Sequence, residues 1–435
     1  MLVQDVSRGS WNRVTEDVHH ALNGEAAAKL RTLVPRQVRR EAGSFFTSGG
    51  VRQSFEDLLS SHIDSSERLW FWDPTCGAGD LLLAATAHLP LGQSPAETLS
   101  LWGRRLRGQD LDDSFVGAAR MRLLLTVLQR HRLEDSWAPL TERQQRNSFR
   151  HIQVGDGLEA LHEAASSKRF YGHLLLNPPY GARTVGRECA WASGKTSQAA
   201  IFSSTAIDAL KAGGRVVAIL PDVLRSGSRY NAWRRRFEAH ATVEEIAPYG
   251  LFDNHTDVDV FLISAKRKKG GHAGSVQWWP PRLANETSIG DLFHVRVGSV
   301  VDNRDPHTGI ESPYLTARDL PADGEMPLPA RTREFNGAKV TPPFVAIRRT
   351  SRPGQGAKGS FRGAGVLVVG NEAVAVDNHL IVASPKDGTI DKCRELIKVL
   401  GSQSSAQWLD ERIRCRHLTV RVVKELPWPL EDGLF

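Results

Sequence analysis

A regular alternation of short apolar runs and longer amphipathic stretches spans residues 69 to 265. The apolar runs, among them RLWFWDP, HLLLNPPY and GGRVVAILP, are short enough to be buried strands, and Gly, Asp or Pro interrupts each one before the next helical stretch. Repeated strand–helix units of this kind build a mostly parallel sheet with helices on its faces. The pattern therefore predicts an α/β domain.

The residue composition and pattern differ on both sides of this region. Residues 1–40 carry Ala, Leu and Val among charges, which predicts a helical segment, and we expect residues 41–270 to form the α/β domain. A Lys- and Arg-rich linker at 266–274 comes next. Residues 275–435 hold Pro- and Gly-rich loops, short strands and one helical stretch, which predicts a separate α+β domain.

Charge and cysteine content narrow the classes of function. The net charge of +7 is common among proteins that follow phosphate backbones. Four cysteines stand far apart without a CxxC pair, so we expect no metal site and no disulfide framework. The first residues lack the apolar core of a signal peptide, and no run approaches ~18 apolar residues, so we expect a cytoplasmic protein without a membrane span.

The first apolar run ends in a glycine-containing turn with the sequence DPTCGAGD. Gly77 and Gly79 allow the backbone to pass close to a ligand. The helix that follows offers unpaired N–H groups at its N-terminus. Turns of this kind hold many nucleotide-like ligands, and others serve only the fold.

Acidic residues end the next two predicted strands. Asp110 ends the second, where a carboxylate can accept hydrogen bonds from both hydroxyls of a ribose. Asp156 ends the third, where it can accept a hydrogen bond from an adenine amino group. Taken alone, each is equally consistent with a solvated charge at a strand end.

The fourth predicted strand ends in Asn177, Pro178, Pro179 and Tyr180. Two consecutive prolines hold the chain in a rigid, extended turn. The side-chain oxygen of Asn177 and the carbonyl of Pro178 can then accept both hydrogens of one amino group, and Tyr180 offers a ring for stacking. This arrangement suits the exocyclic amine of adenine, a poor nucleophile that has to be oriented toward a methyl donor.

Taken in order, these segments resemble the gamma group of adenine-N6 DNA methyltransferases, which includes the modification enzymes of restriction systems. The resemblance covers about residues 40 to 268. It implies a Rossmann-like class I methyltransferase domain that binds S-adenosylmethionine, followed by a C-terminal α+β target-recognition domain. It also implies double-stranded DNA as the partner and a separate restriction or specificity subunit as a further candidate partner.

The resemblance assigns a role to each segment. It implies that the cofactor contacts Thr47, Asp73, Pro74, Thr75, Cys76, Gly77, Gly79, Asp110, Leu111, Asp156, Gly157 and Asn177. It assigns catalysis to Asn177, Pro178, Pro179 and Tyr180, and stacking on the base to Tyr180 and Phe252, although Phe252 is also consistent with an ordinary core aromatic. The family often has Pro after the residue that corresponds to Thr47, where this chain has Ser48.

The C-terminal domain contributes a basic loop. Its candidate DNA contacts are Arg348, Arg349, Arg352, Lys358 and Arg362. We expect the chain to methylate N6 of an adenine flipped out of double-stranded DNA at specific sites, within a restriction-modification or anti-phage system.

Four alternatives stay open at this point. N4-cytosine methylation poses the same chemical problem, although those enzymes more often have Ser at the position of Asn177. RNA adenine methylases and protein-glutamine methylases share the tetrapeptide, but the glutamine methylases lack a large basic C-terminal domain. A non-catalytic DNA-binding subunit of a defence complex would have no need for Asn177.

Overall fold

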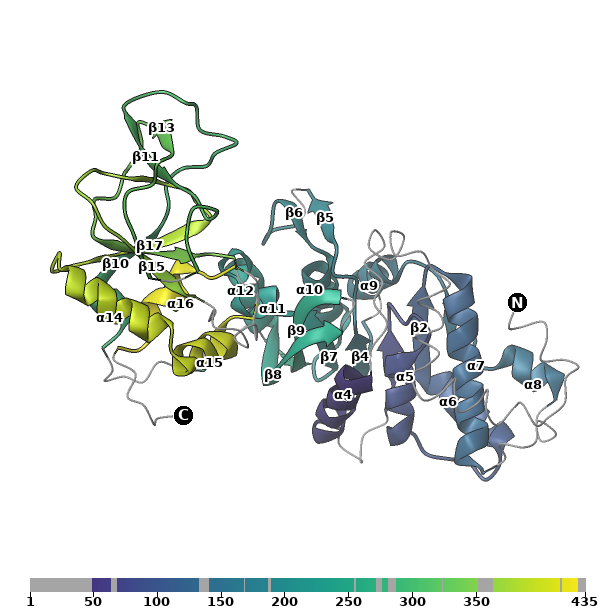
Figure 1. Cartoon of the computed structure of the whole chain (residues 1–435). Helices are drawn as coiled ribbons and strands as arrows, with labels where there is room; N and C mark the ends of the chain where they lie inside the picture. The colour runs from purple at the N-terminus through teal and green to yellow at the C-terminus, as the bar shows by residue number, and fades with distance from the viewer. Residues whose placement is uncertain are drawn as a thin grey trace, which may run out of the picture. The chain divides into compact units, whose positions relative to one another are not determined.

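The computed structural model describes residues 49–63, 69–132, 141–167, 169–186, 189–253, 256–270, 276–280, 287–322, 324–350, 363–414 and 417–428. These residues form two compact units (Figure 1). The first unit holds the described residues up to Leu224 and from Arg229 to Val276, and the second holds Arg225–Ser228 and those from Gln277 onward. The expected helical segment at residues 1–40 lies outside the described residues.

A seven-stranded sheet forms the centre of the first unit, with the strand order β3-β2-β1-β4-β7-β9-β8. Its strands are β1 (Phe71–Asp73), β2 (Leu106–Asp110), β3 (Ile152–Val154), β4 (His173–Leu176), β7 (Arg215–Pro221), β8 (Ala241–Asp253) and β9 (Thr256–Arg267). All neighbours from β3 to β7 pair in parallel, whereas β9 runs antiparallel to both β7 and β8. The predicted Rossmann-like α/β fold with a mostly parallel sheet is confirmed.

Helices cover this sheet and connect its strands. They are α4 (Gly49–Ser61), α5 (Asp80–Ala85), α6 (Pro95–Arg105), α7 (Asp113–Arg130), α8 (Glu142–Asn147), α9 (Gly157–Ser166), α10 (Gln198–Ala209), α11 (Asp222–Ser226) and α12 (Asn231–His240), the residues of α11 being divided between the two units. Side-chain caps start several of them: Ser94 accepts a hydrogen bond at α6, Asp112 at α7 and Asp156 at α9. Phe71, Leu82 and Leu123 are among the residues that pack the buried core between strands and helices.

A short hairpin follows β4 directly. Its strands, β5 (Ala182–Val185) and β6 (Gly194–Ser197), pair antiparallel and are not part of the central sheet. The main-chain N–H of Gln198 donates to the carbonyl of Gly181 at 2.8 Å and closes the base of the hairpin.

The second unit contains a five-stranded sheet with the order β10-β17-β14-β15-β12 and a three-stranded sheet with the order β13-β11-β16. Its elements are α13 (Ile289–Leu292), β10 (Phe293–Val297), β11 (Glu311–Leu315), β12 (Gly324–Met326), β13 (Thr332–Glu334), β14 (Phe344–Arg348), β15 (Gly365–Val368), β16 (Ala375–Val376), β17 (Leu380–Pro385), α14 (Ile390–Leu400), α15 (Gln403–Arg412) and α16 (Val420–Glu425). The mixture of sheets and helices agrees with the predicted α+β class.

Strand β14 shows why both faces of the larger sheet are covered. Val345 and Ile347 point to a core that includes Leu396 of α14, which lies against this sheet (Figure 1). Phe344 and Ala346 belong to a second core on the other face. Successive strand residues point to opposite faces, so a strand without polar alternation has to be buried on both sides.

Candidate active site

Four strand ends meet at one edge of the first unit's sheet. Strands β3, β2, β1 and β4 are parallel neighbours, so their carboxyl ends lie side by side. The segments that follow these strands contain Asp156, Asp110, the turn after Asp73 and Asn177. The structure therefore brings together the four segments that the sequence singled out. Carboxyl ends of parallel strands are the usual place for a ligand in open α/β sheets.

The turn after β1, residues 74–79, is called the glycine loop below. Its left-handed residues are Gly77 (φ 49°) and Gly79 (φ 88°). A Cβ on Gly79 would lie 3.0 Å from the Cβ of Ala119, whereas a Cβ on Gly77 would meet open space. The loop thus uses one glycine to pack against α7 and leaves the backbone at the other open to a ligand.

Asp73 holds the start of the glycine loop. Its Oδ1 accepts a hydrogen bond from the main-chain N–H of Thr75 at 3.0 Å. Burial, together with the charge of the neighbouring Asp110, raises the pKa of Asp73 to about 8. The predicted cofactor residue therefore shapes the loop from beneath, with a side chain that solvent does not reach.

Arg122 of α7, which the sequence did not single out, supports the other end of the loop. This buried guanidinium donates from Nη1 to the carbonyl of Ala78 at 2.6 Å and from Nη2 to Asp80 Oδ1 at 2.9 Å. Two fixed donors on one planar group restrain both the last turn of the loop and the first residue of α5. Only packing between distant segments creates this contact, so no local motif indicates it.

Asp110 joins the second strand to the glycine loop. Its Oδ2 accepts a hydrogen bond from the N–H of Gly77 at 2.9 Å, and its Oδ1 accepts one from Asp112 at 3.0 Å. Burial raises the pKa of Asp110, and these two bonds oppose the shift. A carboxylate has about four acceptor positions, so both oxygens can still accept hydrogen bonds from a diol.

Two exposed apolar side chains flank Asp110. Leu111 is 75% exposed, and Val154, the register partner of Asp110 on β3, is 53% exposed. Exposed apolar side chains are stabilised when a ligand covers them and removes them from water. Side chains of this kind can pack against the faces of a planar ring. Leu111 was predicted. Val154 was not, although its place just before Gly155 and Asp156 at the end of an apolar run was a signal.

The third segment touches the first. A Cβ on Gly157 would lie 1.6 Å from the carbonyl oxygen of Pro74, so only glycine permits this approach. Asp156 caps α9: its Oδ1 accepts hydrogen bonds from the N–H groups of Leu158 at 2.7 Å and Glu159 at 3.3 Å. The cap fixes the carboxylate in place and uses only its Oδ1.

The fourth segment, residues 177–180, is an internally bonded turn. The hydroxyl of Tyr180 donates to Asn177 Oδ1 at 2.7 Å. The hydroxyl of Thr75 donates to the carbonyl of Asn177 in a long hydrogen bond of 3.5 Å, which links this turn to the glycine loop. Burial raises the pKa of Tyr180 well above its ordinary value, so the hydroxyl stays a donor.

Phe252 lies in the core behind Tyr180. Its ring is 1% exposed and packs edge-on against Tyr180, with ring centroids 5.7 Å apart and an interplanar angle of 88°. In this arrangement Phe252 supports the tyrosine ring. Its predicted contact with a base stays a prediction and requires the side chain to become exposed.

Two further predicted site residues have buried side chains. Cys76 is buried, and its N–H donates to the carbonyl of Gln109 at 2.8 Å. Pro178 is buried as well. Thr47 lies outside the described residues.

The predicted DNA contacts belong to the second unit. Arg348 donates to the carbonyls of Leu320 and Pro321, and Arg349 donates to the carbonyl of Asn378 at 3.2 Å. Both guanidinium groups therefore hold loops of that unit. Arg352, Lys358 and Arg362 fall outside the described residues.

With this geometry established, the sequence comparison decides the family. Residues 32–279 match the family of N-6 DNA methylases. The chain belongs to this family. No curated protein matches the sequence. The matched residues of this N-6 DNA methylase include the glycine loop, Asp110, Asp156 and residues 177–180.

One solved structure shares the fold at low sequence identity, and another is similar over part of the chain. The type IIL restriction-modification enzyme MmeI, solved in complex with DNA, is 13% identical, with a TM-score of 0.54 over 92% of this chain and 70% of that one. A modification subunit of a putative type I restriction enzyme from Vibrio vulnificus YJ016 is 19% identical, with a TM-score of 0.40 over 59% of this chain. The match covers only 50% of that subunit's length.

Two further features are absent from the described residues. None of the described helices is long and apolar enough to cross a membrane. Within the same residues, no group of three or more His, Cys, Asp and Glu side chains is placed to hold a metal ion.

Proposed function

We propose that the chain transfers a methyl group from S-adenosylmethionine to the N6 amine of adenine in double-stranded DNA. The observation that carries this proposal is the place of residues 177–180 at the carboxyl end of β4, where Thr75 links them to the glycine loop. Methyl donor and acceptor amine would then be held by adjoining loops. Catalysis would come mainly from positioning the two reactants.

The residues at this edge fit the cofactor. Gly77 would present open backbone to its methionine part, and Asp110 would accept hydrogen bonds from the ribose hydroxyls. Leu111 and Val154 would flank the adenine ring, and Asp156 would accept from its amino group. When bound, the cofactor supplies a methyl group on a positively charged sulfur.

Asn177 would orient the acceptor amine. Its amide oxygen has two lone pairs, and the hydroxyl of Tyr180 occupies one of them. The amide oxygen of Asn177 and the carbonyl of Pro178 would accept the two hydrogens of the adenine amine. Because Tyr180 keeps its proton, the tyrosine serves as a positioning donor and a stacking ring, and no strong base is required.

The adenine has to leave the duplex to reach this turn. Flipping a base costs a few kcal/mol, which stacking on an aromatic ring can offset. Tyr180 would supply that ring, held at its edge by Phe252. We further propose that the reaction serves a cytoplasmic restriction-modification or anti-phage system with a separate restriction or specificity subunit as partner.

Replacement of Asn177 tests this mechanism. Asn177→Ala should lower methylation of DNA by about 100-fold or more, the size of effect seen when a single fixed hydrogen-bonding group is removed from an active site. Cofactor affinity, measured by calorimetry, should stay close to that of the unaltered chain. Asn303→Ala is the matched control, because Asn303 is an exposed asparagine of the second unit. Near-normal turnover of Asn177→Ala would contradict the mechanism.

A further inference from the structure

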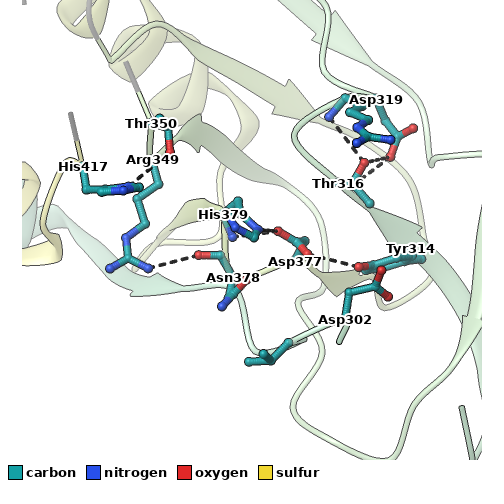
Figure 2. Close-up of polar contacts among 12 residues, drawn as sticks. Asp302, Tyr314, Thr316, Asp319, Arg349, Thr350, Asp377, Asn378, His379 and His417 are labelled. Atoms are coloured by element: carbon teal, nitrogen blue, oxygen red, sulfur yellow. Dashed lines mark hydrogen bonds and ion pairs between the residues drawn. The ribbon is translucent and has the colours of Figure 1, made fainter. Parts of the chain in front are cut away.

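The turn between β16 and β17, residues 377–379, is held from several directions (Figure 2). Its six main-chain polar groups all have a partner. The N–H groups of Asp377, Asn378 and His379 donate to the carbonyl of Leu315, the carbonyl of Val300 and Asp377 Oδ1, and the three carbonyls accept from Leu380 N, Arg349 Nη1 and Arg349 N. A turn with no main-chain group left over is rigid and presents only its side chains to a ligand.

The carboxylate of Asp377 is buried and used on both oxygens. Oδ1 lies 2.7 Å from His379 Nδ1 and 2.7 Å from its N–H, while Oδ2 accepts from the hydroxyl of Tyr314 at 3.2 Å. Burial, and then the charge of Asp377, raise the pKa of Tyr314, so this hydroxyl remains a donor. Asp377 therefore fixes the ring of His379 and is itself fixed from β11.

The ring so held faces solvent, since the side chain of His379 is 67% exposed. A carboxylate only accepts hydrogen bonds, so Nδ1 carries a proton and Nε2 is the ring nitrogen left for a partner. An exposed ion pair contributes little to stability. Restraining an exposed side chain does reduce the entropy lost when that side chain binds a partner.

Two buried polar atoms beside His379 lack a partner within the described part of the chain. They are Arg349 Nε, a donor, and Asn378 Oδ1, an acceptor. Arg349 already bonds the turn through Nη1 and its main-chain N–H. Both atoms are inaccessible to solvent, so they belong to the interior of the turn and not to the surface that His379 presents. His417, exposed and within 3.2 Å of the Thr350 hydroxyl, lies on the same side of the turn in Figure 2.

We propose that His379 is a specificity-determining residue that contacts a base edge in the DNA recognition sequence, and that Asp377 is its positioning residue. The proposal rests on the proposed function, which makes DNA the substrate. An outward ring nitrogen can hydrogen-bond the base edges that the major groove presents.

The test is a selection of bound duplexes from a random-sequence DNA pool by the full chain, since this readout does not require methylation. His379→Ala should lose about tenfold in discrimination at one base pair and keep the rest of the preferred sequence. Asp377→Asn should weaken preference at the same base pair, because the ring is then no longer held in one orientation. His294→Ala, at another exposed histidine of the second unit, should leave the selected sequence unchanged.

Three results would overturn the proposal. One is an unchanged preference in His379→Ala. Another is a uniform loss of binding with a shallower salt dependence, which would make His379 a phosphate contact. The third is a full chain that binds the pool with no preference at all. Failure of the proposed function looks different: the chain would select a sequence that His379→Ala alters, yet form no methylated base on it.

Discussion

The glycine loop of the first unit and the 377–379 turn of the second are both short, rigid connections at strand ends, but they present different groups. In the glycine loop, side chains from elsewhere hold the backbone, and a Cβ on Gly77 would meet open space. In the 377–379 turn, every main-chain N–H and C=O group is hydrogen-bonded, and the imidazole of His379 is exposed. Main chain suits a ligand that never changes, whereas a side chain can be exchanged by one substitution.

This contrast matches the two tasks that the proposals assign. A cofactor is the same at every turnover, so its site can depend on backbone geometry that tolerates few substitutions. A recognition sequence distinguishes one methylase from another. A rigid turn that carries a replaceable side chain could therefore change specificity while its fold persists.

The largest effect is expected at Arg122, which supports the glycine loop. Arg122→Met leaves the buried carboxylate of Asp80 without its partner, and removal of one member of a buried pair costs about 3–5 kcal/mol. Denaturant unfolding would measure the loss. Asp80→Leu in the same chain should recover much of it, because no buried charge then remains. Equal destabilisation in the single and double variants would show that the pair does not support the loop as described.

A smaller loss is expected at Gly157. Its added Cβ in Gly157→Ala would collide with the carbonyl of Pro74, and overpacking of this kind costs about 1–3 kcal/mol. The displaced loop should also weaken cofactor binding, which calorimetry would detect. Gly117→Ala is the matched control, since Gly117 lies within α7 with nothing near its added Cβ and should be neutral or stabilising. The account of the loop would be wrong if both variants bound cofactor equally well.

At the other turn, Tyr314→Phe removes one hydrogen bond to Asp377 and keeps the ring. We expect a loss of about 1 kcal/mol in the free energy of unfolding. We also expect a weaker sequence preference at the base pair assigned to His379, because Asp377 loses one of its restraints. Cofactor affinity should not change. A change would contradict the assignment of cofactor binding to the glycine loop and of sequence recognition to the 377–379 turn.

An effect of pH is expected at Asp73, whose pKa rises on folding from 3.8 to about 8. Between these values the folded chain binds more protons than the unfolded chain. The stabilising contribution of Asp73 is therefore complete below the unfolded pKa and is lost as pH rises through the folded pKa. Urea midpoints at about pH 5 and about pH 9 should fall more for the unaltered chain than for Asp73→Asn. Parallel pH profiles would contradict the shift.

Local motifs were enough to predict part of the fold and part of the candidate site. Asp73 and Asn177 each follow an apolar run directly, so strand and ligand position could be located together. The antiparallel pairing of β9 was not predicted, because an apolar strand is equally compatible with either direction.

Contacts between distant segments could not be predicted in the same way. Arg122 and Ala78 are 44 residues apart, and Tyr314 and Asp377 are 63 apart. Neither pair leaves a periodic or local signal, because only the packed fold brings its members together. In the second unit Leu315, Val300 and Arg349 hold the 377–379 turn from distant parts of the sequence. Sequence patterns therefore indicated basic loops and missed the turn.

The most direct test of the central claim is mass spectrometry of nucleosides from unmethylated plasmid DNA incubated with the chain and S-adenosylmethionine. The account predicts new N6-methyladenine, and Asn177→Ala should reduce it to near background. New N4-methylcytosine would keep the orientation of an amine by Asn177 and contradict the assignment to adenine. No modified base, from a chain that binds both cofactor and DNA, would contradict the proposed reaction.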